Sequence, residues 1–427
     1  MLDRKIQPAA EPINTINIPE TKVVKAPNGI DIHILDMGEQ EVTRIDLMFG
    51  AGKWDQKKPL TAMFTNLLLK EGVDGLTSQE VAEQLDYYGA WLQPSATFHN
   101  SYVTLYSLNK HSKHTLPLLE KIVKTPLFNE DEFNVIRSRR KQQFLVEEER
   151  VQVQAFNKFI ELLFSSEYPY GQHANLEAFD KLTADDLKEF HRSYYNSANC
   201  RIILTGRVTQ EILDEVIALF GKEKWGGDLQ DSAKEFSIKT ATPGRYLIEK
   251  KDALQSAVRI GLPVVGREHP DYPKLRILNT LLGGYFGSRL MANIREDKGY
   301  TYGIGSSITT LKNASYLSIS TQTATEYTEL LIEEVFKEIE RLRIEKVEEE
   351  EMLMIRGYLM GEIARLFDGP FSIADAHQSL LANNMDTSYY YQMIEAIQSI
   401  TPDEILDLAR KYFIKENFYV VVAGQKA

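Results

Sequence analysis

The sequence is poor in cysteine, in long apolar runs and in net positive charge. A single cysteine, Cys200, excludes an intrachain disulfide, and its place in the apolar run CRIILTG favours a buried, inert thiol. No stretch is long and apolar enough to cross a bilayer. Aspartate and glutamate outnumber lysine and arginine by 61 to 49, so the net charge is -12. This acidic balance argues against nucleic acid as a partner.

The amino terminus also lacks the features of a signal peptide. Its first residues, MLDRKIQPAAEPINTINIPE, contain no apolar core and no cleavage-like site. We therefore expect a cytoplasmic protein with no membrane span. A chain trimmed of its leader would look the same, which leaves the periplasm open. The length of 427 residues, 43% of them hydrophobic, is enough for two to four domains with ample cores.

Metal-binding motifs are missing as well. The eight histidines fall in no H-E-x-x-H or H-x-x-E-H frame. His111 and His114 are three positions apart, but Lys110 and Lys113 lie beside them, so an exposed loop or helix start explains them better than a metal site.

What the chain does contain is an internal repeat. The segment TADDLKEFHRSYYNSANCRIILTG, residues 183–206, aligns without a gap on TPDEILDLARKYFIKENFYVVVAG, residues 401–424, at an offset of 218. Both begin with a capping threonine and first-turn acids, run through an amphipathic helix, and finish as an apolar strand ending in glycine. A period this long points to duplicated domains, because solenoid repeats are much shorter.

We therefore predict two similar halves. The first domain spans residues 1–225, a polar linker spans 226–244 with Gly226-Gly227 and Pro243-Gly244, and the second domain spans 245–427. Strands and helices alternate without a Rossmann glycine signature. The expected fold class is thus α+β, with each half an antiparallel or mainly antiparallel sheet backed by helices.

The segment 281–307, LLGGYFGSRLMANIREDKGYTYGIGSS, combines helical spacing with an early stop. Lys298-Gly299 predicts the end of a helix, and the alternation from Tyr300 to Ser306 predicts a strand after it. Arg295 and Tyr302 lie seven positions apart across this turn. Aimed together, they would form a donor pair suited to a peptide carbonyl or to the oxyanion that water attack creates. Spacing alone favours the plainer alternative, a solvated arginine at a helix end and a tyrosine packed in a sheet.

The residues LLGGYFGSRL followed by IREDKGYTYGIG resemble the carboxyl-terminal half of the insulinase/pitrilysin family of zinc metallopeptidases, in the branch that includes the processing peptidases. SSEYPYG and the helix-strand segment after it also resemble this family, so the resemblance covers nearly the whole chain. It implies a clam-like chamber built from two chains. It also implies that Arg295 and Tyr302 contact substrate at a zinc site carried by a different half-molecule.

Active members of that family carry a helix with HxxEH, and a third zinc ligand, a glutamate, lies 77 positions after the second histidine. Matching this helix to residues 59–71 places Ala62 and Asn66 at the histidines, Thr65 at the general base and Gln143 at the third ligand. Ala62 offers no lone pair, and Asn66 and Gln143 are weak neutral donors for zinc. Thr65 has no group that titrates near neutral pH. We therefore expect a degenerate zinc site, with no metal or other cofactor bound by this chain.

The resemblance thus predicts a non-catalytic subunit of a heterodimeric zinc metallopeptidase. Its expected partner is a homologous HxxEH-bearing subunit that supplies the zinc, and the two together would take a peptide or unfolded polypeptide. A homodimer in the absence of that partner stays open. The alternative is a structural or peptide-holding homologue with no role in proteolysis. In either case the chain alone is not expected to be an enzyme.

Overall fold

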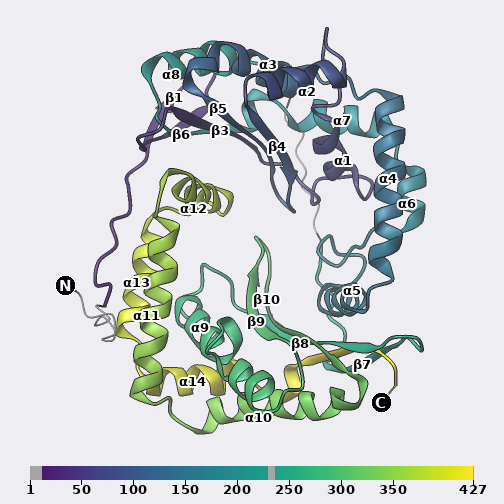
Figure 1. Cartoon of the computed structure of the whole chain (residues 1–427), viewed down its shortest axis with the longest axis vertical. Coiled ribbons are helices and arrows are strands. Elements are labelled where there is room, and N and C mark those ends of the chain that lie inside the picture. Colours follow the sequence, from purple (N-terminus) through teal and green to yellow (C-terminus); the bar gives the residue numbers. More distant parts are fainter. Residues whose placement is uncertain (1–11, 229–235, 427) are drawn as a thin grey trace, which may run out of the picture.

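The computed structural model describes residues 12–228 and 236–426, and two mixed sheets dominate it, one in each half (Figure 1). The first sheet has the spatial order β1-β2-β6-β3-β5-β4 and the second β7-β11-β8-β10-β9. The strands are β1 (Lys22–Lys25), β2 (Asp31–Asp36), β3 (Val42–Phe49), β4 (Trp91–Ala96), β5 (Ser101–Leu108), β6 (Cys200–Gly206), β7 (Gly244–Glu249), β8 (Gln255–Val264), β9 (Ile304–Thr310), β10 (Ser315–Ala324) and β11 (Tyr419–Gly424).

Both sheets follow one topology. In the first, β2 lies parallel to β6, and β3, β5 and β4 follow in antiparallel order. In the second, β7 lies parallel to β11, and β8, β10 and β9 follow in antiparallel order. Strand β1 is an addition at the edge of the first sheet. The predicted fold class, two mainly antiparallel sheets backed by helices, is confirmed.

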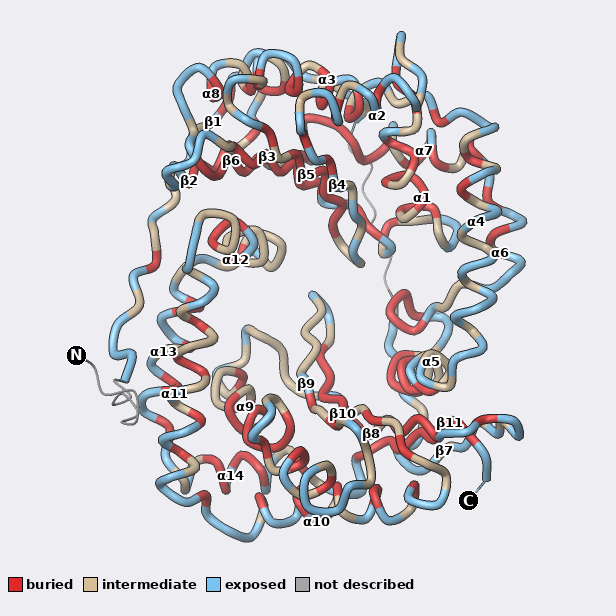
Figure 2. The backbone as a smooth tube through the Cα atoms, viewed as in Figure 1, coloured by how far each residue is buried: buried red, intermediate tan, exposed pale blue. Residues whose placement is uncertain are grey.

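Helices fill the rest of each half. The first half contains α1 (Thr61–Leu68), α2 (Ser78–Tyr87), α3 (Ser112–Lys124), α4 (Glu130–Glu148), α5 (Val151–Phe164), α6 (Leu176–Lys181), α7 (Ala184–Tyr194) and α8 (Gln210–Val216). The second contains α9 (Tyr272–Asn279), α10 (Thr328–Ile344), α11 (Glu349–Leu366), α12 (Pro370–Ala382), α13 (Ser388–Ser399) and α14 (Pro402–Tyr412). Wider helical turns, η4 (Thr280–Gly284) and η5 (Met291–Asp297), follow α9. Figure 2 shows the buried residues concentrated along the sheets and on the helix sides that face them.

The sequence repeat appears in the structure as two equivalent helix-strand units. Helix α7 begins after Thr183 and α14 after Thr401, and each threonine forms a capping box with an acid three residues later. The strands that follow, β6 and β11, occupy equivalent interior places in the two sheets. The predicted linker ends where β7 begins, and residues 229–235 within it lie outside the described residues.

Each half lends one helix to the sheet of the other half. The offset of 218 that relates the repeats places α5 on α12, and both helices cross over (Figure 1). Helix α5 packs against β8 and β11, where Phe159 and Leu163 share a core with Tyr316. Helix α12 packs against β6, where Ile373 joins Ile203. The halves are therefore interlocked by two reciprocal contacts.

Polar contacts fix α12 to the first sheet. Arg44 on β3 pairs with Asp46 beside it, with 2.8 Å between Nε and Oδ2, and its Nη1 lies 2.7 Å from Oδ1 of Asp375 on α12. His377 of α12 meets His33 of β2, with 3.1 Å between Nε2 and Nδ1. Because the side chains of Arg44 and Asp46 are almost fully buried, this junction is ordered by charge as well as by apolar contact.

Within residues 12–228 and 236–426, no helix combines the length and the apolarity that a bilayer crossing requires.

Candidate functional site

Arg295 projects from η5, the wide helical turn that ends before Gly299. Ile294 beside it is fully buried, which anchors the turn and leaves Arg295 partly exposed. The amide of Tyr300 donates to the carbonyl of Ile294 at 3.0 Å, and Gly299 has a φ of 67°. A left-handed residue at this position is the usual end of a helix and costs glycine little. The predicted helix stop at Gly299 is confirmed.

The strand predicted from Tyr300 begins later, at Ile304, so Tyr302 lies in a loop. Side-chain hydroxyls take up the backbone carbonyls that a ladder would have used. Thr301 Oγ1 donates to the carbonyl of Gln322 at 2.6 Å, and Thr323 Oγ1 donates to the carbonyl of Tyr300 at 2.6 Å. The alternation of the sequence was misleading because threonine hydroxyls compete with strand pairing through local hydrogen bonds. They hold the loop in one place beside β10.

The structure brings Arg295 and Tyr302 together. The guanidinium carbon of Arg295 lies 5.5 Å from the ring centre of Tyr302 and 4.9 Å from that of Phe286. The Tyr302 side chain is 94% exposed, so it is not packed in a sheet. Among the described residues, no carboxylate lies within ion-pair distance of Arg295. The two rings lie against a planar group whose N–H donors lie in its plane, which suits donation to a carbonyl oxygen.

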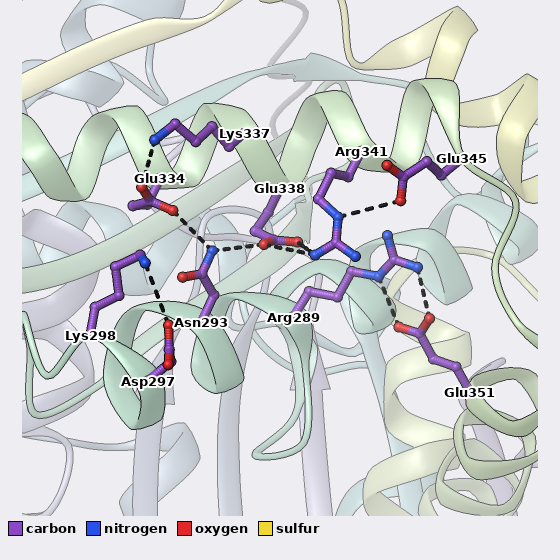
Figure 3. A network of polar contacts seen from close by, with 10 residues as sticks. All are labelled: Arg289, Asn293, Asp297, Lys298, Glu334, Lys337, Glu338, Arg341, Glu345 and Glu351. Carbon is purple, nitrogen blue, oxygen red and sulfur yellow. Dashed lines mark hydrogen bonds and ion pairs between the residues drawn. The ribbon is translucent and has the colours of Figure 1, made fainter.

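A network of charged and amide groups holds η5 in position (Figure 3). Asn293 Nδ2 donates to Glu338 Oε1 at 2.7 Å, and Arg341 Nη1 donates to the same oxygen at 3.2 Å. Arg289, just before η5, forms a two-pronged pair with Glu351 of α11 at 2.9 and 2.7 Å. Glu338 is only 2% exposed, so η5 is tied to α10 from within the protein. Sequence reasoning missed this network because its partners lie 45 and 62 positions apart, with no local signal.

The positions matched to the zinc helix face the interior of the first half. Ala62, Thr65 and Asn66 on α1 are buried. Asn66 Nδ2 donates to Ser101 Oγ and to the carbonyl of Ala62, each at 3.0 Å, and Thr65 Oγ1 donates to the carbonyl of Thr61 at 2.9 Å. These groups are used inside the fold and do not open toward a chamber.

Gln143 is not brought to them. It lies exposed on α4 and accepts a hydrogen bond from Arg140 at 3.2 Å. The less buried side of α1 carries Met63 and Leu67, and Phe144 of α4 packs against the same core. If the HxxEH alignment is shifted by one residue toward the carboxyl terminus, Met63, Leu67 and Phe144 take the three ligand positions. None of them offers a lone pair that binds zinc well. Within the described residues, no group of three or more His, Cys, Asp or Glu side chains could hold a metal ion.

Two other candidates have structural roles. Cys200 is buried, as predicted, and burial raises the pKa of its thiol. His114 stacks on Tyr88 with ring centres 4.7 Å apart and planes 4° from parallel.

A cavity of about 650 Å³ lies between the two halves. The first half contributes Asn199, Arg201 and His99, and the second half contributes Lys312 and Asn313, among others. His99 Nε2 lies 2.6 Å from the hydroxyl of Tyr170, and burial together with the charge of Lys312 lowers the pKa of His99 to about 4. Neither Arg295 nor Tyr302 lines this cavity, so the donor pair belongs to a different surface.

Comparison with known proteins supports the family resemblance. Residues 181–359, from the end of α6 into α11, match the family model described as the peptidase M16 inactive domain. The description of the matched domain as inactive supports a non-catalytic homologue of the M16 peptidases.

Relatives that align over most of the chain are described in one case as a zinc protease and in another as a non-peptidase homologue. The "uncharacterized zinc protease YmxG" of Bacillus subtilis is 21% identical over 403 residues, which cover 91% of this chain and 95% of that protein. The "non-peptidase homolog YmxG" of Helicobacter pylori is 23% identical over 435 residues, and this alignment covers 99% of this chain and 96% of that protein. A crystal structure of a peptidase M16 inactive domain from Pseudomonas fluorescens superposes with a TM-score of 0.85 at 24% identity, over 96% of this chain and 99% of that one.

Proposed function

We propose that this chain is the non-catalytic subunit of a two-chain zinc metallopeptidase, in which Arg295 and Tyr302 grip the peptide bond while a homologous HxxEH-bearing subunit supplies the zinc, the water and the base. The observation that carries the proposal is the exposed Tyr302, whose ring centre lies 5.5 Å from the guanidinium carbon of an arginine that has no acidic partner within the described residues. Such donors stabilise the charge that develops on a carbonyl oxygen when water attacks it.

The setting of the pair supports this role over a structural one. Tyr302 gives almost no area to the core, so packing does not account for it. Its loop is nevertheless held by a buried threonine hydroxyl. An amide–carboxylate hydrogen bond ties η5 to α10, and an ion pair ties Arg289, just before η5, to α11. A donor pair on an anchored backbone at an exposed surface is suited to binding.

The decisive experiment mixes the chain with an HxxEH-bearing homologue and follows cleavage of an unstructured peptide. We expect the mixture to cleave and either chain alone to be inactive or much slower. Tyr302→Phe and Arg295→Ala should each lower kcat by about 10²- to 10³-fold, the usual effect of losing one oxyanion donor. Tyr300→Phe is the matched control, because the Tyr300 ring stacks on Tyr327 with centres 5.1 Å apart, and activity should be unchanged.

Two results would contradict the proposal. Cleavage by this chain alone that stops on addition of a chelator would mean that it carries its own metal. Equal activity of the Arg295→Ala, Tyr302→Phe and unmutated mixtures would remove the donor role and favour the structural or peptide-holding alternative.

A further inference from the structure

A second arginine, on the second sheet, has no acidic partner among residues 12–228 and 236–426. Arg259 of β8 stands opposite Ser320 of β10, and Ser320 stands opposite Gly305 of β9. Residues paired across strands share one face, so these three form a row. The neighbours of Arg259 along β8, Val258 and Ile260, point into the helix-backed core on the other face. Because strands lie about 4.8 Å apart, the row brings Arg259 within about 10 Å of β9, near its start beside the Tyr302 loop.

The contacts of Arg259 leave most of its hydrogen-bonding capacity unused. Its guanidinium carbon lies 4.9 Å from the ring centre of Phe156 on α5, and Nη1 donates to Ser318 Oγ at 3.4 Å. Among the described residues, no carboxylate lies within ion-pair distance. Burial lowers the pKa of Arg259, yet a guanidinium remains charged in proteins. A half-buried cation without an anion is costly, and this chain has twelve more acids than bases from which a partner could have come.

Arg259 opens into a small pocket between α5 and the second sheet. The pocket has a volume of about 230 Å³, and Gln152, Gly303, Ser320 and Gln322 are among the residues that line it. Arg259 is the one ionisable group in this lining. Helix α5 begins at Val151 without a side-chain cap, so its amino-terminal end adds positive potential beside Gln152. The volume is below the usual 300–1,000 Å³ of ligand sites and suits a single side chain or a chain end.

We infer that this pocket, the Arg259 pocket, is a specificity subsite that takes a carboxylate of the peptide held by Arg295 and Tyr302. The inference rests on the proposed function, since Gly303 of the pocket wall directly follows Tyr302 in the chain. The guanidinium would donate two parallel hydrogen bonds to the carboxylate, the geometry in which arginine binds it best. The carboxylate belongs to an aspartate or glutamate side chain or to the carboxyl terminus of the peptide, which share this chemistry.

Binding of fluorescein-labelled peptides to the full chain, measured by anisotropy, tests the inference. One unstructured sequence is made with a central Asp or a central Asn, both with an amidated end, and a third version carries Asn with a free carboxyl end. We expect one carboxylate version to bind about tenfold to a hundredfold more tightly than the amidated Asn peptide, as for hydrogen bonds to a charged group. Tighter binding of the Asp peptide would show that the pocket takes an acidic side chain, and tighter binding of the peptide with a free carboxyl end would show that it takes the chain end.

Variants assign the preference to the pocket. Arg259→Gln should abolish it while the amidated Asn peptide binds as before, and Arg259→Lys should keep part of it because the charge remains without the planar fork. Arg245→Gln is the matched control, since Arg245 lies on β7 of the same sheet but pairs with Glu329, and the preference should be unchanged. Thermal unfolding of each variant shows that the fold is intact.

The outcomes separate this inference from the proposed function. If all three peptides bind the unmutated chain equally and Tyr302→Phe weakens each of them, the subsite is wrong and the proposed function stands. A carboxylate preference that survives in a folded Arg259→Gln or Arg259→Lys variant at full strength also overturns the subsite. If no peptide binds, with or without the HxxEH-bearing homologue, both are wrong.

Discussion

The two halves differ where a helix leads into the edge strand of each sheet. In the first half, α2 is followed by Gly89 with a φ of 59°, and β4 begins at Trp91. In the second half, η5 is followed by Gly299 with a φ of 67°, but β9 begins only at Ile304. One residue separates glycine from strand in the first case and four in the second. The additional residues form the loop that presents Tyr302, so a small change at an equivalent turn separates a structural edge from a candidate binding edge.

At the first-half edge, Trp91 stacks on Tyr106 of the neighbouring strand, with ring centres 5.3 Å apart and planes 24° from parallel, and it remains 59% exposed. The second-half edge leaves Tyr302 in solvent beside Arg295. Both copies of the duplicated fold thus keep the same core pattern, while the second copy exposes the polar donors Arg295 and Tyr302.

Because α5 and α12 each pack against the sheet of the other half, a residue from one half of the sequence should stabilise the other half. Phe159→Ala, in the first half of the sequence, should remove a fully buried ring from the core against Tyr316 and lower the free energy of unfolding by about 3–5 kcal/mol. The equivalent change on the other helix, Ile373→Ala, should cost about 2–5 kcal/mol. Urea unfolding measures both. A loss below about 1 kcal/mol in either would show that the crossing helix is not part of the cooperative fold.

Ion pairs hold α12 to the first sheet, and breaking the buried one should affect this sheet strongly. Arg44→Leu would leave the buried carboxylate of Asp46 without its cation and should lower the free energy of unfolding by about 3–5 kcal/mol. Asp375→Asn is the control, since its side chain is 68% exposed and the loss should stay below about 1 kcal/mol. Chemical denaturation of the two variants compares them directly. Equal losses would mean that the exposed contact matters as much as the buried pair.

Acid should weaken the α12 junction. Burial, and then the neighbouring His33, lowers the pKa of His377 to about 4, whereas an unfolded histidine titrates near about 6.5. The unfolded chain therefore binds the proton first, so this contribution is complete above about pH 6.5 and is lost as the pH falls toward 4. After solvent screening we expect a loss of about 1–2 kcal/mol. Unfolding measured between pH 7 and 4 should show a smaller slope for His377→Gln, and an unchanged slope would contradict this origin.

The smallest expected difference concerns the repeated caps. Thr183→Ala and Thr401→Ala each remove a capping box at equivalent helix starts and should each cost about 1 kcal/mol. Thermal or urea unfolding measures the pair side by side. If only one substitution has an effect, the two copies of the repeat are not energetically equivalent.

Much of the fold could be predicted from the sequence because the signals for its helices and strands are local. Capping threonines, amphipathic spacing and terminal glycines repeat at the offset of 218, and the structure places equivalent helices and strands there. The predicted stop at Gly299 was confirmed for the same reason. The strand expected from Tyr300 begins only at Ile304, because threonine side chains on β10 bond to the preceding residues, and no local pattern reports on β10.

The candidate site was accessible only in part. The spacing of Arg295 and Tyr302 indicated that they could meet, but Phe286 beneath the guanidinium and the exposure of Tyr302 are tertiary facts. Helix α1 also buries Thr65 and Asn66 more deeply than Met63 and Leu67, which residue types alone do not indicate. Ser101, 35 positions beyond Asn66, accepts a hydrogen bond from the Asn66 amide and so lowers the cost of burying it.

The sequence by itself determined the duplicated α+β architecture, the absence of zinc ligands from the HxxEH frame and the family to which the resemblance pointed, because each depends on residue types and short spacings. Only the tertiary structure decided that α5 and α12 cross between the halves, that no acid in the described part of the chain pairs with Arg259, and that Tyr302 is exposed to solvent. Those facts depend on which distant segments meet. Such contacts are set by packing and burial across the whole fold, which local sequence patterns do not encode.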